Sequence, residues 1–308
     1  MSTIPRTEWI WHNGRFVKWE DATVHVTVHA LHYGSSVFEG LRAYATPNGP
    51  AILAVEAHIR RLFGSCRVMR MDLPYSAEQI SSAVIEVVRR NELESCYIRP
   101  LVYKGSGPIG LDARPAPTEM AIFAFEFGRY LGDEAIEQGV DVMVSSWRRI
   151  APDTLASMSK SGGNYVSSQF ITMEARDLGF AEAIALDVNG MVSEGGGENI
   201  FAVYRGALYT PPVGASILMG VTRDCVLTLA QDFGMEVREQ SFPREMLYLA
   251  DEIFFTGTAV EISPVRSVDR IQVGDGTPGP VTRKLQEAFF GILNGKKPDT
   301  HGWLTFVK

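Results

Sequence analysis

Three consecutive glycines between two glutamates, in residues 193–199, constrain the fold of this chain more than any other feature. Glycine inside a helix or strand costs conformational entropy, so such a run marks a bend rather than the interior of an element. Strand-like apolar segments flank it: 182–188 and 191–194 meet at an Asn-Gly turn, and 200–204 follows the glycines. The pattern predicts a β meander whose glycine bend either ends a hairpin or leaves room for a flat ring or an anion.

The overall composition excludes several classes of protein. With 308 residues the chain is long enough for one large domain or two of about 150. It is 45% hydrophobic and 21% charged, as in a globular protein rather than a disordered one. No apolar run reaches the ~18 residues of a membrane span, and the first residues do not resemble a secretory signal. The net charge of −7 argues against a nucleic-acid binder, whose surface would be basic.

The three cysteines, Cys66, Cys96 and Cys225, lie far apart in apolar segments. We expect buried free thiols in a reducing, cytoplasmic environment. No spacing of cysteine and histidine resembles a zinc site, so no metal is predicted.

The first half of the chain has the pattern of a sheet covered by two helices. A hairpin is predicted around Asn13-Gly14, and amphipathic helices are predicted over 56–71 and 76–91, the second with a capping box of Ser76 and Gln79. Strand patterns occupy residues 9–17, 23–28, 40–44, 51–55, 97–103 and 119–127.

The second half adds the meander to further helices. Its predicted elements are a strand over 140–144 and helices over 164–178, 221–233 and 281–293. We therefore predict an α+β fold of two domains, each a sheet or barrel-like sheet packed with helices, with a cleft between them. The predicted boundaries are an N-terminal domain over 1–128, an interdomain loop over 129–139 and a C-terminal domain over 140–308.

Lys160 is the first basic residue after Ala151 and is followed by two glycines. A buried lysine can lose its charge and form a Schiff base with an aldehyde, and Gly162-Gly163 would allow close approach of the backbone. Tyr165, at the start of a predicted helix, would place its hydroxyl at the same group. Taken singly, Lys160 is most simply a solvated surface lysine, and a core aromatic residue explains Tyr165 equally well.

Glu194, at the start of the glycine bend, adds a carboxylate to this pattern. A pyridine ring accepts electrons only when its nitrogen is protonated, and a carboxylate partner maintains that proton. The alternative is a surface glutamate at a hairpin end. Lys160, Tyr165 and Glu194 together suggest a covalently held, nitrogen-containing ring cofactor and hence amine chemistry.

Two donor-rich segments suggest an anion site. Residues 220–224 open the predicted helix over 221–233, where free N–H groups and the hydroxyl of Thr222 would bind phosphate. Residues 256–259 form a second bend after an apolar strand, and Arg61 is a further candidate for the same phosphate. An ordinary helix cap explains Thr222 equally well, as a solvated helix face explains Arg61.

Arg99 interrupts a strand that is otherwise apolar. An arginine in a buried strand needs a counter-anion, which is either a structural carboxylate or the carboxylate of a substrate. From the pattern alone Tyr33, Phe38, Tyr97 and Tyr130 are most simply core aromatic residues.

Together these segments resemble the branched-chain amino acid aminotransferases, which are pyridoxal-phosphate enzymes of fold type IV. The resemblance extends over residues 9–303. It is carried by six motifs in order: His29-Ala-Leu-His-Tyr-Gly-Ser-Ser-Val-Phe-Glu-Gly-Leu-Arg42, Tyr97-Ile-Arg-Pro100, Lys160-Ser-Gly-Gly-Asn-Tyr165, Ser193-Glu-Gly-Gly-Gly-Glu-Asn199, Gly220-Val-Thr-Arg-Asp224 and Gly257-Thr-Ala-Val-Glu-Ile-Ser-Pro264.

The resemblance implies a role for each matching residue around pyridoxal 5'-phosphate in the interdomain cleft. Lys160 would be the catalytic, Schiff-base lysine that moves a proton between the substrate Cα and the cofactor C4′. Tyr165 would bind the ring hydroxyl and Glu194 the pyridinium nitrogen. The remaining cofactor contacts would be Arg61, Val221, Thr222 and Thr258 at the phosphate and Leu218 on the ring face.

The resemblance also implies a substrate pocket. The α-carboxylate would be bound by Tyr97 and the Thr258-Ala259 backbone, with Gly197 also lining the pocket. Arg99 would meet the distal carboxylate of glutamate, whereas aliphatic side chains would contact aromatic walls formed by Tyr33, Phe38 and Tyr130.

The implied reaction is transamination of leucine, isoleucine and valine with 2-oxoglutarate by a ping-pong mechanism, in a cytoplasmic homodimer or homohexamer. Three positions depart from the best-known bacterial pattern: Met158-Ser159 before the lysine, Phe127 in place of tryptophan, and Met219 before Gly220. The nearest alternatives are a D-amino acid transaminase, an (R)-amine transaminase or an aminodeoxychorismate lyase of the same fold. A non-catalytic cofactor-binding protein is the alternative from another class.

Overall fold

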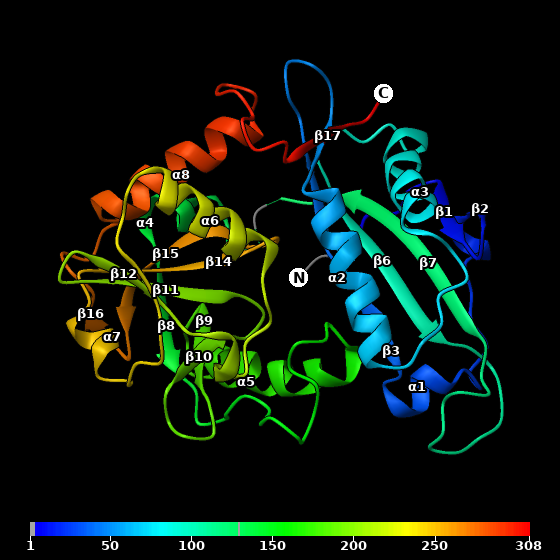
Figure 1. Cartoon of the computed structure of the whole chain (residues 1–308), viewed down its shortest axis with the longest axis horizontal. Helices are drawn as coiled ribbons and strands as arrows, with labels where there is room; N and C mark the ends of the chain where they lie inside the picture. Colours follow the sequence, from blue (N-terminus) through cyan, green and yellow to red (C-terminus); the bar gives the residue numbers. More distant parts are fainter. Residues whose placement is uncertain (1–3, 129) are drawn as a thin grey trace. The chain divides into compact units, whose positions relative to one another are not determined.

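The computed structural model describes residues 4–128 and 130–308. Its contacts divide the chain into two compact units. Unit 1 contains residues 1–128, 159–163 and 292–308, and unit 2 contains 129–158 and 164–291. Each unit has its own sheet and its own helices (Figure 1), so the predicted α+β class is confirmed.

Unit 1 is built on an eight-stranded sheet whose neighbouring strands pair antiparallel. The order is β17-β5-β4-β6-β7-β1-β2, and β3 pairs with β6. The strands are β1 (Trp9–His12), β2 (Arg15–Lys18), β3 (Ser36–Phe38), β4 (Leu41–Tyr44), β5 (Ala51–Leu53), β6 (Cys96–Lys104), β7 (Thr118–Glu126) and β17 (Leu304–Phe306). The β1–β2 turn has positive φ at Asn13 (47°) and Gly14 (87°), as the Asn-Gly signal predicted.

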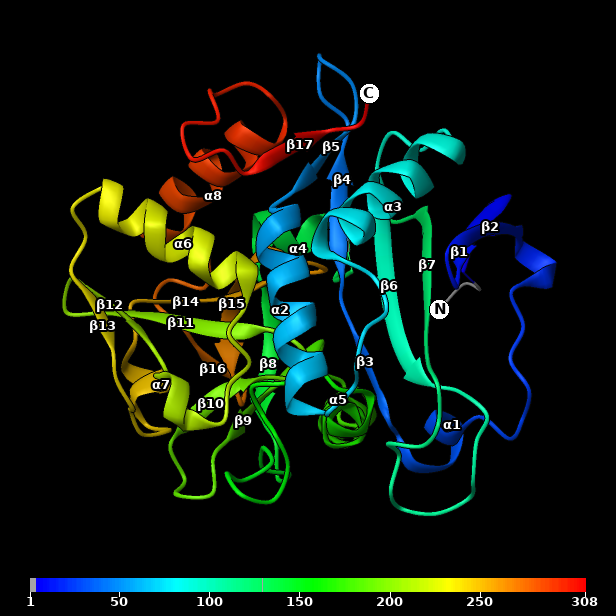
Figure 2. The ribbon, with the colours of Figure 1, turned by 45° about the vertical axis from the view of Figure 1, so that its right-hand side comes forward.

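Helices α2 (Val55–Val68) and α3 (Ala77–Arg90) lie along one face of this sheet (Figure 2). The predicted capping box of Ser76 and Gln79 is present at the start of α3. Alternate residues of β6, Ile98 and Val102, point into the core beneath the helices. The side chains on either side of Ile98, Tyr97 and Arg99, therefore project from the opposite face of the strand.

One predicted strand of this unit is absent. Residues 23–28 alternate in polarity, but the structure gives them no strand, only an isolated bridge between Val28 and Ser106. Val24 and Val26 are 51% and 68% exposed, so no apolar surface covers them. A short 3-10 helix (Trp19–Asp21) precedes this segment, and α1 (His29–Tyr33) follows it.

Unit 2 contains a nine-stranded sheet of order β10-β9-β8-β15-β14-β11-β12-β13, with β16 pairing with β15. Its strands are β8 (Val140–Val144), β9 (Glu182–Leu186), β10 (Val192–Gly195), β11 (Asn199–Tyr204), β12 (Ala207–Thr210), β13 (Val237–Glu239), β14 (Glu252–Gly257), β15 (Glu261–Val268) and β16 (Ile271–Gln272). Strand β8 runs parallel to β9 and β15, and the predicted meander is β9 to β11.

The helices of unit 2 pack on this sheet because its strands bury both faces. On β9, Ile184 belongs to the main core, whereas Ala183 and Ala185 pack against Ile171 and Ala175 of α5. The helices are α4 (Asp133–Gln138), α5 (Tyr165–Asp177), α6 (Val221–Asp232), α7 (Met246–Leu249) and α8 (Pro280–Leu293), with a 3-10 turn at Val213–Ala215. A second 3-10 turn, Gly162–Asn164, begins in the lysine segment and ends at the start of α5.

The division into units differs from the predicted domains in two ways. The lysine segment 159–163 and the C-terminal residues 292–308 belong to unit 1, because they pair with its strands and contact α2 rather than the sheet of the sequence around them. The stretch predicted as a loop, 129–139, contains helix α4. Arg129, its first residue, lies outside the described part of the chain, as do residues 1–3 of the predicted N-terminal domain.

We find no helix in the described ranges, 4–128 and 130–308, with the length and apolarity needed to cross a membrane.

Candidate active site

The backbone of Lys160 is held from two sides within unit 1. Its N–H donates to the Oγ of Ser65 on α2 at 3.0 Å, and its carbonyl accepts from the N–H of Phe38 on β3 at 2.9 Å. Ser161 forms a bridge with Val37. A Cβ at Gly162 would overlap the hydroxyl of Ser36, and glycine at this position avoids that overlap. The position of the lysine is therefore fixed by main-chain contacts that do not depend on its side chain.

The side chain of Lys160 is half-buried, and its ammonium nitrogen lies 5.0 Å from the centroid of the Phe38 ring. Tyr165 is the first residue of α5 in unit 2 and is also half-buried. Asn164 before it donates to the carbonyl of Ala156 at 2.8 Å, which ties the start of the helix to the preceding loop.

Arg61 has a structural partner. Its Nε and Nη2 donate to the two carboxylate oxygens of Glu39 at 2.7 and 2.8 Å. His58, one turn earlier on α2, contacts Glu39 Oε2 at 2.8 Å. Burial opposes ionisation of Glu39, but Arg61 and His58 together hold its pKa below the ordinary value. Burial, together with the charges of Arg61 and Lys160, lowers the pKa of His58 although Glu39 raises it, which favours the neutral imidazole.

Arg99 lies on an aromatic surface. Its guanidinium carbon is 4.6 Å from the centroid of the Phe38 ring and 5.1 Å from that of Tyr97, and its Nη2 donates to the Tyr97 hydroxyl at 3.0 Å. Its Nε is buried without a hydrogen-bond partner. Within the described residues no carboxylate pairs with this guanidinium, which speaks against the structural-carboxylate interpretation.

The structure thus brings Phe38, Tyr97 and Arg99 together on one face of the unit 1 sheet. Tyr97 also requires Gly40 on the adjacent segment, because a Cβ there would overlap its hydroxyl. Tyr33 lies at the end of α1 in this unit, where it is 43% exposed and its ring is 4.6 Å from that of His29.

Glu194 is buried at the centre of a polar network in unit 2. Its Oε1 forms an ion pair with Arg149 at 2.7 Å, and both side chains are 6% exposed. Its Oε2 accepts from Asn199 Nδ2 and from the N–H of Leu218, each at 3.0 Å. A guanidinium and two N–H donors favour the ionised carboxylate.

Asn199 connects Glu194 to the start of α6. Its Nδ2 also donates to the carbonyl of Leu218 at 2.8 Å, and a Cβ at Gly220 would overlap its Oδ1. Gly220 is the N-cap residue of α6 and gives no side-chain capping bond, so the first N–H groups of the helix, at Val221 and Thr222, are left for another acceptor.

A buried hydroxyl lies on the strand beside this helix. Thr256, 1% exposed on β14, has an Oγ1 without a hydrogen-bond partner, and α6 packs on β14. Thr258 and Ala259 follow in the turn after β14 and are half-buried.

A second buried acid, Glu198, lies behind the glycine bend. Its Oε2 accepts from the N–H of Gly197 at 2.9 Å, whereas its Oε1 has no partner. Burial, followed by the nearby Glu182, raises the pKa of Glu198 well above its ordinary value, and Arg149 lowers it less. Tyr130, 38% exposed, lies near both acids and near Arg176. Burial and the proximity of the two carboxyl groups therefore favour the protonated form of Glu198.

We expect Glu198→Gln to stabilise the protein increasingly as the pH rises. A raised folded-state pKa means that stability is lost as the pH rises from about 4.5 through that pKa, by up to about 1.4 kcal/mol per pH unit. Glutamine has the shape of the protonated acid but cannot ionise. Thermal unfolding at about pH 5 and about pH 8 should show a variant-minus-wild-type difference that grows with pH; a constant difference would contradict the buried proton.

Sequence reasoning missed the residues that hold the candidate groups in place. Arg149 and Ser65 carry no signal in the sequence, because each acts on a partner distant in the chain. Glu39 and Asn199 stood within the motifs, but nothing indicated that they pair with Arg61 and Glu194.

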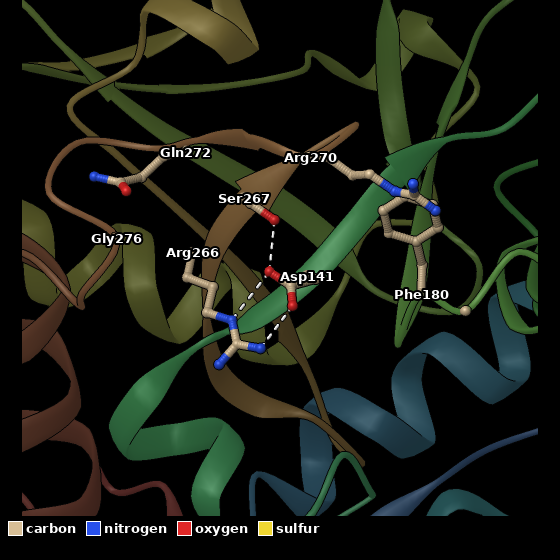
Figure 3. Close-up of a pocket in the computed structure, with 8 residues that line it drawn as sticks. Asp141, Phe180, Arg266, Ser267, Arg270, Gln272 and Gly276 are labelled. Carbon is tan, nitrogen blue, oxygen red and sulfur yellow. Dashed lines mark hydrogen bonds and ion pairs between the residues drawn. The ribbon is translucent and has the colours of Figure 1, made fainter.

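A pocket of about 460 Å³ in unit 2 contains none of the predicted site residues. Its acidic group, Asp141, is already bound: Arg266 donates to it at 2.6 and 3.0 Å, and Ser267 donates to the same carboxylate. Arg270 lies over the Phe180 ring (Figure 3). This pocket is therefore not the candidate active site.

Comparison with known proteins shows the family of this chain. The family model of amino-transferase class IV matches residues 36–268. The branched-chain-amino-acid aminotransferase of Salmonella typhimurium is 52% identical over 305 residues, covering 98% of each chain. The crystal structure of the Escherichia coli branched-chain amino acid aminotransferase superposes with a TM-score of 0.95 at 51% identity, covering 98% of this chain and 100% of that one.

A third relative was solved in its cofactor-bound form. The branched-chain amino acid aminotransferase from Thermobaculum terrenum, in the PLP-form, is 35% identical with a TM-score of 0.92, over 98% of this chain and 99% of that one. The resemblance drawn from the six motifs is thereby confirmed, as is the fold type that it implied. The chain belongs to the class IV amino-transferases and, within them, to the branched-chain-amino-acid aminotransferases.

Proposed function

We propose that this chain catalyses pyridoxal-phosphate-dependent transamination of leucine, isoleucine and valine with 2-oxoglutarate. The products are the branched-chain 2-oxo acids and L-glutamate, formed by a ping-pong mechanism. Full-length relatives named for this activity support the proposal. Within the chain, the observation that best supports the proposal is the environment of Arg99. Its guanidinium lies on an aromatic surface and has no carboxylate partner in the described residues.

The residues present fit pyridoxal 5'-phosphate. An amine (Lys160), a phenol (Tyr165) and a buried, ionised carboxylate (Glu194) match its aldehyde, hydroxyl and ring nitrogen. The uncapped start of α6 and the unpartnered hydroxyl of Thr256 are suited to its phosphate. We assign the phosphate to Val221 and Thr222 together with Thr258 and Arg61, and the ring face to Leu218.

When bound, the cofactor supplies an electron sink for the charge released at the substrate Cα. Lys160 would be the base that moves the proton between the substrate Cα and C4′, and its side chain would start from a constant position because its backbone is held by Ser65 and Phe38. Glu194 holds a proton on the ring nitrogen, and Arg149 keeps that carboxylate charged. Tyr165 donates or accepts at the ring hydroxyl.

The pocket must accept two kinds of side chain. We propose that Phe38, Tyr33 and Tyr130 form apolar walls for the branched chains, and that Arg99 pairs with the distal carboxylate of glutamate. Tyr97, Gly197 and the Thr258-Ala259 backbone would bind the α-carboxylate. The hydrogen bond from Arg99 to Tyr97 links the two carboxylate sites.

Single-turnover measurements of each half-reaction test the substrate assignment. The holoenzyme should convert its cofactor rapidly with L-leucine and with L-glutamate, and slowly with D-alanine or (R)-1-phenylethylamine. Preferred turnover of D-alanine or the (R)-amine would replace this proposal by a D-amino acid or (R)-amine transaminase of the same fold.

Arg99→Met should separate the two amino donors. Loss of a charged hydrogen-bonded pair, worth about 1.5–3 kcal/mol, should slow the L-glutamate half-reaction by roughly 10- to 100-fold. The L-leucine half-reaction should stay within about threefold, because methionine preserves the apolar contact with Phe38, and it serves as the internal control. Equal losses for both donors would show that Arg99 does not select the carboxylate.

We further propose that the chain works as a cytoplasmic homodimer or homohexamer. Ile109 and Leu111, 81% and 89% exposed, support a partner surface in the segment before β7. Light scattering after size-exclusion chromatography would measure the assembly, and a monomer at working concentrations would contradict it.

A further inference from the structure

Three ionisable groups are buried together beneath the lysine segment in unit 1. Glu39 and His58 are 0% and 1% exposed, and Arg61 is 14% exposed. Glu39 uses both oxygens to bind the Nε and Nη2 edge of the guanidinium, and its Oε2 also accepts from His58 and from the N–H of Gly40. Each of these contacts helps to hold the carboxylate in one orientation.

The neighbouring arginine on α2 shows what Arg61 would do without this arrangement. Arg60 forms an i,i+4 pair with Glu56 in which the side chains are 74% and 87% exposed. Such a solvated pair contributes little to folding stability and does not hold the guanidinium in one orientation. Arg61 instead is largely buried, and two parallel hydrogen bonds join it to Glu39. This bidentate geometry restricts the orientation of a guanidinium more than a single bond does.

Stability alone does not account for a buried trio of this kind. Well-packed apolar side chains of the same volume would be as stable or more so, since desolvation of the charges offsets much of their attraction. The bidentate contact engages the Nε–Nη2 edge of the guanidinium, and the edge formed by Nη1 and Nη2 has a geometry that matches a phosphate as well as a carboxylate.

His58 keeps the trio electrically balanced. Burial lowers the pKa of His58, and the charges of Arg61 and Lys160 lower it further, although Glu39 opposes them. A neutral imidazole donates one N–H to Glu39 and adds no second positive charge beside Lys160. The trio then carries one negative and one positive charge.

We propose that Glu39 and His58 are positioning residues that orient Arg61 for the phosphate of the cofactor. The inference rests on the proposed function, because it takes the phosphate contact of Arg61 from there. Neither residue touches the cofactor; each acts through the guanidinium.

The apoprotein can be titrated with pyridoxal 5'-phosphate and with pyridoxal, which lacks the phosphate. Comparing the two Kd values distinguishes loss of the phosphate contact from a general loss of folding. Glu39→Gln should raise the Kd for pyridoxal 5'-phosphate by roughly 10- to 100-fold and that for pyridoxal by less than about threefold. Glu39→Asp keeps the charge but moves the carboxylate away from Arg61 by one methylene. It should raise the Kd for pyridoxal 5'-phosphate more than that for pyridoxal, and it replaces Glu39→Gln if that variant does not fold. Arg60→Ala is the matched control and should change neither Kd.

A double-mutant cycle tests whether Glu39 affects binding of the phosphate through Arg61. Glu39→Gln added to Arg61→Ala should weaken binding no further, because the guanidinium that Glu39 positions is gone. His58→Gln retains an N–H donor for Glu39 and should preserve the preference for the phosphorylated ligand, whereas His58→Leu should reduce it.

Three results would overturn the inference: equal weakening of both ligands by Glu39→Gln and Glu39→Asp, additive effects in the cycle, or no loss of preference in His58→Leu. An Arg61→Ala variant with unchanged affinity for pyridoxal 5'-phosphate is a different failure. It would remove Arg61 from the proposed phosphate site while leaving Lys160 and Glu194 in place.

Discussion

Lys160→Ala is expected to lower kcat by at least about 10³-fold, because positioned proton transfer alone contributes 10²- to 10⁴-fold and the covalent link to the cofactor is lost as well. The variant should fold normally, since the two hydrogen bonds that fix residue 160 come from its backbone. Borohydride reduction of the holoenzyme should attach the cofactor mass to Lys160 in the wild type and to no residue in the variant.

Lys104 provides the matched control for this experiment. It is a buried lysine of the same unit, 4% exposed, and its Nζ donates to the Ala116 carbonyl at 2.9 Å and to Thr118 at 3.2 Å. Lys104→Met should lower the unfolding temperature but leave the label on Lys160 and kcat close to the wild-type value. A Lys160→Ala protein that kept activity and the label would refute the catalytic assignment.

Glu194→Gln is expected to reduce kcat by at least about 10²-fold, the loss found when one preorganised electrostatic group is removed from a site where charge develops. Glutamine cannot hold a proton on the ring nitrogen as an anion does. The change also leaves Arg149 buried without its ion pair, which costs about 3–5 kcal/mol of folding stability. Denaturant unfolding and single-turnover kinetics measure the two effects separately.

A double variant distinguishes chemistry from stability. Arg149→Met with Glu194→Gln removes both charges and should recover most of the lost stability, as replacement of a whole buried pair usually does. It should not recover the rate. Activity that returned together with stability would show that Glu194 serves only to hold the fold.

Local patterns predicted most regular elements, because they depend on neighbours in the chain. The helix predicted over 164–178 is α5 (Tyr165–Asp177), and the helix predicted over 221–233 is α6 (Val221–Asp232). The strand predicted over residues 23–28 is absent, because alternating polarity indicates a strand only where a partner strand and a core exist. Helix α4 (Asp133–Gln138) was missed because six residues are too few to show a helical period.

The candidate site was predictable in its chemical groups but not in their partners. The motifs pointed to Lys160, Glu194 and Arg99, whose assigned roles remain predictions. Whether Arg99 has a structural carboxylate was open in the sequence, and the structure shows none among the described residues.

The sequence by itself determined the α+β class, most helices and strands, and the family, since these follow from periodicity and from motifs within short stretches of chain. Only the tertiary structure decided which charges meet. Arg61 pairs with Glu39 22 positions away, and the Lys160 backbone is held by Ser65 across 95 positions. The physical reason is that hydrogen bonds and ion pairs act over a few ångströms, and which side chains come within that distance is set by how the strands and helices pack.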